Sequence, residues 1–488
     1  MIRFIQCLFV FLVVCPPIAA NDPNVLLILV DDLKPSFGAY GADWVHSPNL
    51  DRLAARGLRF DAAYCNQAVC APSRNNLMTS SRSTSLGIYS LGKNFRKAVP
   101  NAVTMPQHFK QHGYHSAGIG KVFHIGHGNT DDPASWSVPF HPDKVVDYVL
   151  PESTGGALTR EEAYFSNQKL GQNRSLPRGA AWEKADVDDG AYSDGRIAAE
   201  GIKRLQQYKE SGQPFFLALG FTKPHLPFCA PKKYWDLYEP SKLPVSSVND
   251  YPQGAPPYAG KHKLGELNQY KPVPQDPPLS EEMTRTLIHG YYAALSYMDS
   301  QLGRVLDELD RLELAEETII VLWGDHGYHL GDHGVWTKHT NYEQANRIPI
   351  LMVAPGITTP GSHSHSLVET VDIFPTVTEL AGLPMIDGPQ AIDGKSLVPI
   401  LKDPQATVRN HASHCFPRAG RLGRAVRTER YRLVEWKPWK GDADKIEYEL
   451  YDYDRDPLET KNWASERPEI VQKLAAILAE HPDARRED

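Results

Sequence analysis

One short string, Cys-Ala-Pro-Ser-Arg at residues 70–74, concentrates the reactive chemistry of this chain. A proline two positions after the cysteine is favoured in a first helical turn, so we expect a helix to begin here. The amides of that turn would point back at the Cys70 side chain and favour negative charge there. Arg74 adds a fixed cation on the same turn. An ordinary buried thiol before a helix is the alternative interpretation of Cys70.

Acidic side chains follow two separate apolar runs. Asp31 and Asp32 come directly after residues 24–30, and Asp325 and His326 follow a second run. Three carboxylates supply the hard oxygen ligands that Ca²⁺ or Mg²⁺ prefers, while the imidazole either binds the metal or bonds a reacting oxygen. Either pair alone fits a solvated turn or a helix cap. Two pairs at two strand ends, with the cysteine string between them in sequence, instead predict a divalent metal site.

Lysine and histidine side chains form a third group, made up of Lys121, His124, His225 and Lys338. Lys121 and His225 lie just past two further apolar runs. Transfer of a sulfuryl or phosphoryl group places negative charge on outer oxygens, which fixed cations stabilise. The two histidines have the chemistry to move protons on the nucleophile and on the leaving alcohol. For any one of these side chains alone, surface solvation is the alternative.

Alternating apolar runs and helical stretches predict how these groups are held. We expect strands at 24–30, 115–120, 215–220, 318–323 and 349–353, and helices at 47–57, 105–113, 194–211 and 281–312. This pattern is typical of an α/β fold with a large, mostly parallel sheet flanked by helices. Ligands collect at the carboxyl ends of the strands in such sheets, so the polar groups are expected to meet there.

The first 20 residues differ from the rest. Arg3 gives a positive start, an apolar run follows from Phe4 to Val14, and the stretch ends in small residues. This predicts a signal peptide at 1–20, cleaved after Ala20, and a secreted or periplasmic protein, or a lysosomal one if the source is an animal. A membrane anchor is the alternative, but the run is short for a span, so no stable membrane association is expected.

The remainder is long enough for one large and one smaller domain. We expect a catalytic domain at 21–405, with irregular inserts at 125–190 and 228–280 near the substrate mouth. We expect residues 406–488 to form a C-terminal α+β subdomain with a small antiparallel sheet and a helix. Its predicted elements are strands at 425–436 and 447–453 and a helix at 468–481.

Composition argues against two classes of function. The 488 residues carry a formal net charge of −7 and show no basic stripe, so no nucleic-acid partner is expected. The cysteines that follow the leader are too few for a disulfide scaffold. They are Cys65, Cys70, Cys229 and Cys415.

These strings, taken in order, resemble the sulfatase family, and within it the iduronate-2-sulfatase branch. The similarity covers almost the whole chain after the leader and includes the C-x-P-S-R string at 70–74, the segment at 220–228, and the pattern Glu-Leu-Tyr-Asp at 449–452. Two intervening residues between Lys121 and His124, and a histidine at 326, are the choices of that branch. The resemblance implies an alkaline phosphatase-like fold and removal of sulfate from a sulfated carbohydrate, such as a 2-O-sulfated uronic acid. A phosphoester or phosphonate hydrolase of the same superfamily, or a non-catalytic protein that binds sulfated glycans, are the alternatives.

The resemblance also implies a role for each candidate side chain. Cys70 would be oxidised to formylglycine by a formylglycine-generating or maturase enzyme, and its hydrate would be the nucleophile. Arg74 and His124 would surround that hydrate, and Lys121, His225 and Lys338 would contact the sulfate. The implied ligands of Ca²⁺, or of Mg²⁺, are Asp31, Asp32, Cys70, Asp325 and His326.

Tyr328 and His329 depart from the branch, which has a tryptophan and an alanine there. The resemblance implies that this segment lines the sugar pocket, so we expect the pocket to differ at these two positions.

Overall fold

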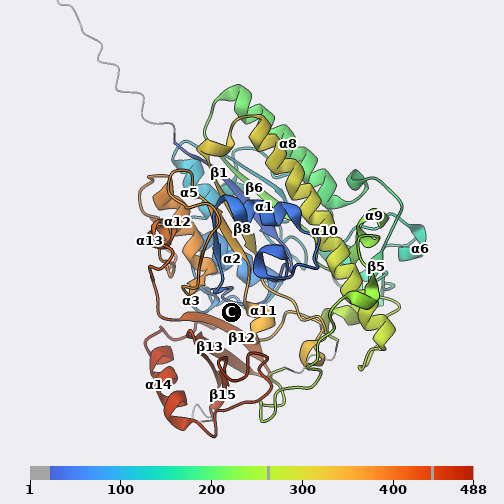
Figure 1. Cartoon of the computed structure of the whole chain (residues 1–488), viewed down its shortest axis with the longest axis vertical. Coiled ribbons are helices and arrows are strands. Elements are labelled where there is room, and N and C mark those ends of the chain that lie inside the picture. The colour runs from blue at the N-terminus through green and yellow to red at the C-terminus, as the bar shows by residue number, and fades with distance from the viewer. Residues whose placement is uncertain (1–21, 261–263, 441–444, 487–488) are drawn as a thin grey trace, which may run out of the picture.

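The computed structural model describes residues 22–260, 264–440 and 445–486, so the predicted signal peptide at 1–20 lies outside the described residues (Figure 1). A seven-stranded sheet runs through the larger part of the molecule, in the order β10-β2-β9-β8-β1-β6-β4. Its strands are β1 Asn24–Val30, β2 Leu58–Phe60, β4 His115–Gly120, β6 Phe215–Phe221, β8 Thr318–Gly324, β9 Ile350–Val353 and β10 Ser362–Ser364. The five predicted strands are therefore confirmed as β1, β4, β6, β8 and β9.

The central strand β1 is parallel to both of its neighbours, β6 and β8. All of its residues are buried, because alternate side chains enter hydrophobic clusters on opposite faces of the sheet. Only β9 runs against both of its neighbours, so the prediction of a mostly parallel sheet is confirmed.

Helices cover both faces of this sheet (Figure 1). On one face, α1 Pro48–Arg56, α8 Ser193–Ser211 and α10 Glu281–Arg311 pack against alternate residues of β1. On the other, α2 Cys70–Thr79, α5 Met105–Gln111 and α12 Ile373–Leu380 do the same. The four predicted helices are present with ends that shift by at most two residues.

Smaller elements complete this part of the chain. The two long inserts are mostly irregular, as predicted, and their short strands β5 and β7 pair with each other. None of the helices in the described ranges has both the length and the apolar character needed to cross a membrane. The remaining short helices and strands of this part of the chain are α3 Ser83–Leu86, α4 Phe95–Ala98, α6 Pro151–Thr154, α7 Arg160–Phe165, α9 Lys232–Trp235, α11 Glu343–Asn346, α13 Val398–Lys402, β3 Ala63–Tyr64, β5 Trp182–Glu183, β7 Phe228–Cys229 and β11 Val368–Glu369.

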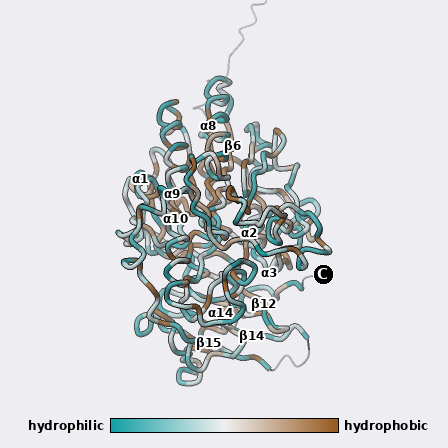
Figure 2. The backbone as a smooth tube through the Cα atoms, turned by 90° about the vertical axis from the view of Figure 1, so that its right-hand side faces the viewer, coloured by the Kyte–Doolittle hydropathy of each residue, from teal (hydrophilic) through white to brown (hydrophobic). Residues whose placement is uncertain are grey.

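The C-terminal part is a four-stranded antiparallel sheet with one helix packed on it, at the lower end of the view in Figure 2. The elements are β12 Ala412–Arg418, β13 Arg421–Arg427, β14 Tyr431–Pro438, β15 Glu447–Asp452 and α14 Pro468–Ala479. The prediction of one strand at 425–436 is wrong, and β12 was not predicted. A turn closed by hydrogen bonds between Thr428 and Tyr431 divides that range, and it contains neither glycine nor proline to signal it.

Asp299 on α10 holds the start of α1 against the sheet. Its Oδ1 accepts the backbone N–H of Leu50 at 2.7 Å and that of Asn49 at 3.1 Å. We expect Asp299→Ala to lower the free energy of unfolding by about 2–3 kcal/mol, because buried donors lose their acceptor. Denaturant titration measures this loss. Asp307→Ala on the same helix removes an exposed pair with Arg52 and should cost under about 1 kcal/mol, so equal losses would contradict the prediction.

Candidate active site

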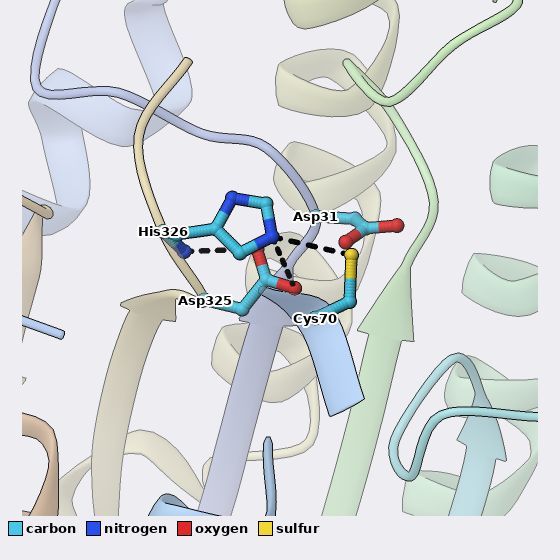
Figure 3. Close-up of side chains that lie close together, drawn as sticks. All are labelled: Asp31, Cys70, Asp325 and His326. Atoms are coloured by element: carbon cyan, nitrogen blue, oxygen red, sulfur yellow. Dashed lines mark hydrogen bonds and ion pairs between the residues drawn. The ribbon is translucent and has the colours of Figure 1, made fainter. Parts of the chain in front are cut away.

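The carboxyl ends of β1 and β8 bring the predicted acids together. In the pairing of these parallel strands Val30 lies beside Gly324, so the residues that follow, Asp31 and Asp325, leave the sheet side by side. Cys70 is the first residue of α2 and approaches the same point from another segment. Figure 3 shows Asp31, Cys70, Asp325 and His326 converging above these strand ends.

Four side chains offer ligand atoms that lie within 4.8 Å of one another, namely Asp31, Cys70, Asp325 and His326, and all four are buried. Asp32 adjoins this group: its Oδ1 lies 3.4 Å from His326 Nδ1 and 3.2 Å from Lys338 Nζ. The same Oδ1 is buried and has no hydrogen-bond partner among the described residues. Three carboxylates, one of which has an unpartnered oxygen, and one imidazole fit a divalent cation.

The acids crowd one another in a dry environment. Burial raises the pKa of Asp32 to about 7, although Lys338 opposes the shift, and burial next to Asp31 raises the pKa of Asp325 well above its usual value. Burial also disfavours ionisation of Asp31, but Lys121, His225 and Arg74 outweigh it and hold its pKa well below the usual value. A cation at this point would allow all three carboxyls to ionise together.

Arg74 is fully buried and is directed at the acids. Its Nε donates to Asp325 Oδ2 at 3.1 Å, and its Nη2 lies 3.3 Å from Asp31 Oδ1. Its Nη1 donates to the carbonyls of Lys121 and Val122. Within the described residues Arg74 makes no hydrogen bond to the Cys70 thiol, but it is near enough for the two charges to interact, so its predicted role beside the modified side chain stays a prediction.

The predicted lysines and histidines also gather around Cys70. Lys121 Nζ pairs with Asp31, and Lys338 Nζ lies 3.2 Å from Asp32 Oδ1. Both lysines are buried. Burial and the nearby Lys121 hold the pKa of His124 and His225 well below the usual value, so both rings are neutral bases.

The thiol of Cys70 lies 3.2 Å from His326 Nε2. Burial raises the pKa of this thiol well above its usual value, even though Lys338 opposes the shift. An unmodified Cys70 would therefore stay protonated at neutral pH, and it would be a poor thiolate nucleophile.

A cleft of about 440 Å³ leads from solvent to Cys70. Its floor carries three predicted residues, His124, His225 and Lys338, and its walls come from the two irregular inserts. Sequence reasoning missed the wall residues, since no periodicity or spacing marks them. They include His127, Arg160, Glu161, Tyr164, Phe165, Arg174, Glu266 and Gln269.

Phe165 of α7 packs against the polar floor of this cleft. Its ring lies 5.0 Å from Lys121 Nζ and 5.5 Å from the centre of the His225 ring, edge to face. An apolar ring at this place reduces water near Lys121 and strengthens the field of this cation.

Tyr328 and His329 do not line the cleft among the described residues, which corrects the expectation drawn from the resemblance. Both side chains are fully buried. Tyr328 stacks on Tyr291 with ring centres 6.0 Å apart, and His329 Nε2 lies 2.9 Å from Thr340 Oγ1. The difference from the branch at these two positions therefore changes the packing beneath the site and not the surface of the pocket.

Comparison with known proteins gives consistent matches along the chain. A family model described as Sulfatase matches residues 23–383, and one described as N-sulphoglucosamine sulphohydrolase, C-terminal, matches residues 331–484. The chain is 37% identical over 406 residues to iduronate 2-sulfatase of Mus musculus, covering 75% of this chain and 70% of that protein. It is 33% identical over 517 residues to iduronate 2-sulfatase of Homo sapiens, covering 90% of each.

Among solved structures, the phosphonate monoester hydrolase of Silicibacter pomeroyi superposes with a TM-score of 0.73. The two sequences are 21% identical, and the match covers 94% of this chain and 95% of that one. This likeness shows the alkaline phosphatase-like fold.

Replacing Arg74 should expose the repulsion between the acids. We expect Arg74→Ala, in metal-free buffer, to lower the free energy of unfolding by about 3–5 kcal/mol, because two buried carboxyls lose their shared cation. Arg74→Lys keeps the charge but loses the forked geometry, so its loss should be smaller. Denaturant titration of both variants measures this order. Arg285→Ala, which removes a pair with the exposed Glu281, is the control and should cost under about 1 kcal/mol.

Proposed function

This chain belongs to the sulfatase family and hydrolyses sulfate esters, and from that premise we propose that its substrate is a sulfated carbohydrate, such as a 2-O-sulfated uronic acid. The observation that carries this proposal is the cleft floor, where Lys338 and two neutral histidines lie around Cys70, with the buried Lys121 close by on Asp31. The two iduronate 2-sulfatases among its relatives act on a sulfated sugar by name, which supports the same substrate class.

We infer that Cys70 carries formylglycine in the active enzyme, placed there by a formylglycine-generating or maturase enzyme. Its Sγ then stands in for an oxygen of the modified side chain. We infer also that Ca²⁺ is held by Asp31, Asp32, Asp325 and His326 with that side chain, since their donor atoms fit such a cation. The modified residue would supply a hydroxyl nucleophile, and the cation would stabilise its negative charge.

The chain's own residues then divide the work on the ester. Lys121 and Lys338 are placed to hold the sulfate oxygens, on which negative charge increases as the ester bond breaks. His225 and Lys338 face the cleft and flank the leaving oxygen, and the protonated Lys338 is placed to give it a proton. His124 has an Nδ1 without a hydrogen-bond partner in the described structure, so it is free to accept a proton from the nucleophile.

Export follows from the signal peptide that the sequence predicts at 1–20. We propose a secreted or periplasmic location, or a lysosomal one in an animal, where sulfated glycans are available as substrates.

A phosphonate or phosphoester hydrolase is the second candidate. The fold shared with a phosphonate monoester hydrolase favours it, because a pocket for one tetrahedral anion also fits another. Rates on 4-nitrophenyl sulfate and 4-nitrophenyl phosphate discriminate the two, and a higher kcat/KM for the phosphate would overturn the sulfatase assignment.

Activity should depend on a modified Cys70. We expect the tryptic peptide that contains residue 70 to show the mass of formylglycine, and we expect the wild type to release sulfate from at least one defined sulfated saccharide. Cys70→Ala should reduce kcat/KM by about 10³-fold or more, because the nucleophile is lost. Cys229→Ala removes a buried thiol outside the site and should keep the activity. An unmodified peptide in a fully active sample would contradict the proposal.

Calcium should stabilise the folded protein through the acid cluster. At a Ca²⁺ concentration 100-fold above its Kd, the gain in free energy of unfolding should be about 2.7 kcal/mol, because only the folded chain presents the site. Thermal unfolding with Ca²⁺ and with a chelator measures the shift. Asp325→Asn should abolish it, while Asp307→Asn at the surface should leave it intact. An identical Tm with and without Ca²⁺ would show that the cluster does not bind this ion.

A further inference from the structure

Glu161 is a buried carboxyl that faces the catalytic cleft without a partner. It lies on α7, only 5% of it is exposed, and it lines the cleft that leads to Cys70. In the part of the chain that the structure describes, its side chain makes no hydrogen bond or ion pair. Its carboxyl oxygens are open to the cleft and not enclosed by protein, so they are available to a group that binds there.

A second carboxyl, Glu266, extends the same wall to the sulfate-binding end of the cleft. Its Oε2 lies 2.6 Å from Lys338 Nζ, and its Oε1 lies 3.3 Å from His225 Nε2. Glu161 is near enough to both Glu266 and Lys338 to feel their charges. Both carboxyls therefore line the cleft near Lys338, the cation that we propose to hold the sulfate.

The state of the Glu161 carboxyl suits a hydroxyl group. Burial, reinforced by Glu266, raises the pKa of Glu161 to about 8, so at neutral pH this carboxyl keeps its proton. It can then both donate and accept a hydrogen bond, as a hydroxyl can. The neighbouring Arg160 does not neutralise it by direct contact, because its guanidinium donates to Gln269 Oε1 and to the carbonyl of Arg174, each at 2.9 Å.

A second anionic group would be disfavoured at the same wall. A sulfate or carboxylate placed there would meet the negative charge of Glu266 in a water-poor pocket, where like charges repel strongly. Lys338 is paired with Glu266, and Arg160 donates to Gln269 and to the carbonyl of Arg174, so neither offers a second anion a free cation beside Glu161.

We propose that Glu161 is a specificity-determining residue that binds a free hydroxyl on the ring carbon next to the sulfated one. Together, Glu161 and Glu266 select sugar sulfates in which this hydroxyl is free over sugars that carry sulfate on both neighbouring carbons. This inference rests on the proposed function, because the free hydroxyl is a feature of the substrate that the same cleft would recognise.

The experiment compares two substrates in each protein: a sugar monosulfate that the wild type hydrolyses and 4-nitrophenyl sulfate, which has no neighbouring hydroxyl. The sugar panel consists of 2-O-sulfated uronic acid, 3-O-sulfated uronic acid and the 2,3-disulfate of the same uronic acid, so each monosulfate has a free hydroxyl on a neighbouring ring carbon. Glu161→Leu should lower the ratio of kcat/KM for the sugar over kcat/KM for the aryl sulfate by about 10-fold, the loss of one hydrogen bond. The amide of Glu161→Gln also donates and accepts hydrogen bonds, so this variant should keep at least about a third of the wild-type ratio.

Glu152→Leu on the neighbouring helix α6 is the matched control, since its side chain is exposed and away from the cleft. An unchanged ratio in Glu161→Leu, or an equal loss on both substrates, would overturn the inference. If Glu161→Leu does not fold, the wild type alone still tests the inference. Hydrolysis of the vicinal disulfate as fast as the monosulfate by the wild type would overturn the inference. A wild type that cleaves the aryl sulfate and no sugar sulfate would instead refute the carbohydrate substrate, and the inference with it.

Discussion

The mutual repulsion of Asp31, Asp32 and Asp325, buried at the ends of two adjacent strands, is the constraint on which the site depends. Parallel pairing of β1 and β8 forces these acids together, and nothing in the sheet itself offsets their charge. Arg74 and two buried lysines supply that charge from other segments. Burying these charges costs free energy of folding, so the cluster is better explained by the binding of a ligand than by stabilisation of the fold.

The same lysines serve two demands. Lys121 and Lys338 pair with acids here, yet the charges of both also act on the Cys70 side chain, and Lys338 lines the cleft. A divalent cation competes with them for the same carboxylates. Metal binding and sulfate binding would therefore support each other, because a lysine relieved of its carboxylate is free to hold an anion.

Chemistry and specificity come from different parts of the chain. The floor of the cleft is built from strand ends and the first turn of α2, which the core holds rigidly. The walls are built from the two inserts, which supply Phe165, Glu161 and Glu266. Inserts of this kind can change without disturbing the acids or Cys70, so a single catalytic floor can serve different sugars.

The sequence by itself determined five of the seven strands of the large sheet, its main helices and the candidate floor of the site. Strands buried on both faces must be continuous apolar runs, and polar residues just past such runs must lie at the sheet edge. The tertiary structure alone decided the rest. The turn at Thr428 lacked the residues that signal turns, so one predicted strand proved to be two. Glu161 and Glu266 lie about a hundred residues apart in irregular segments, where no local pattern records which side chains will face Cys70. Their meeting follows from how the inserts pack over the sheet edge, which is a property of the folded chain.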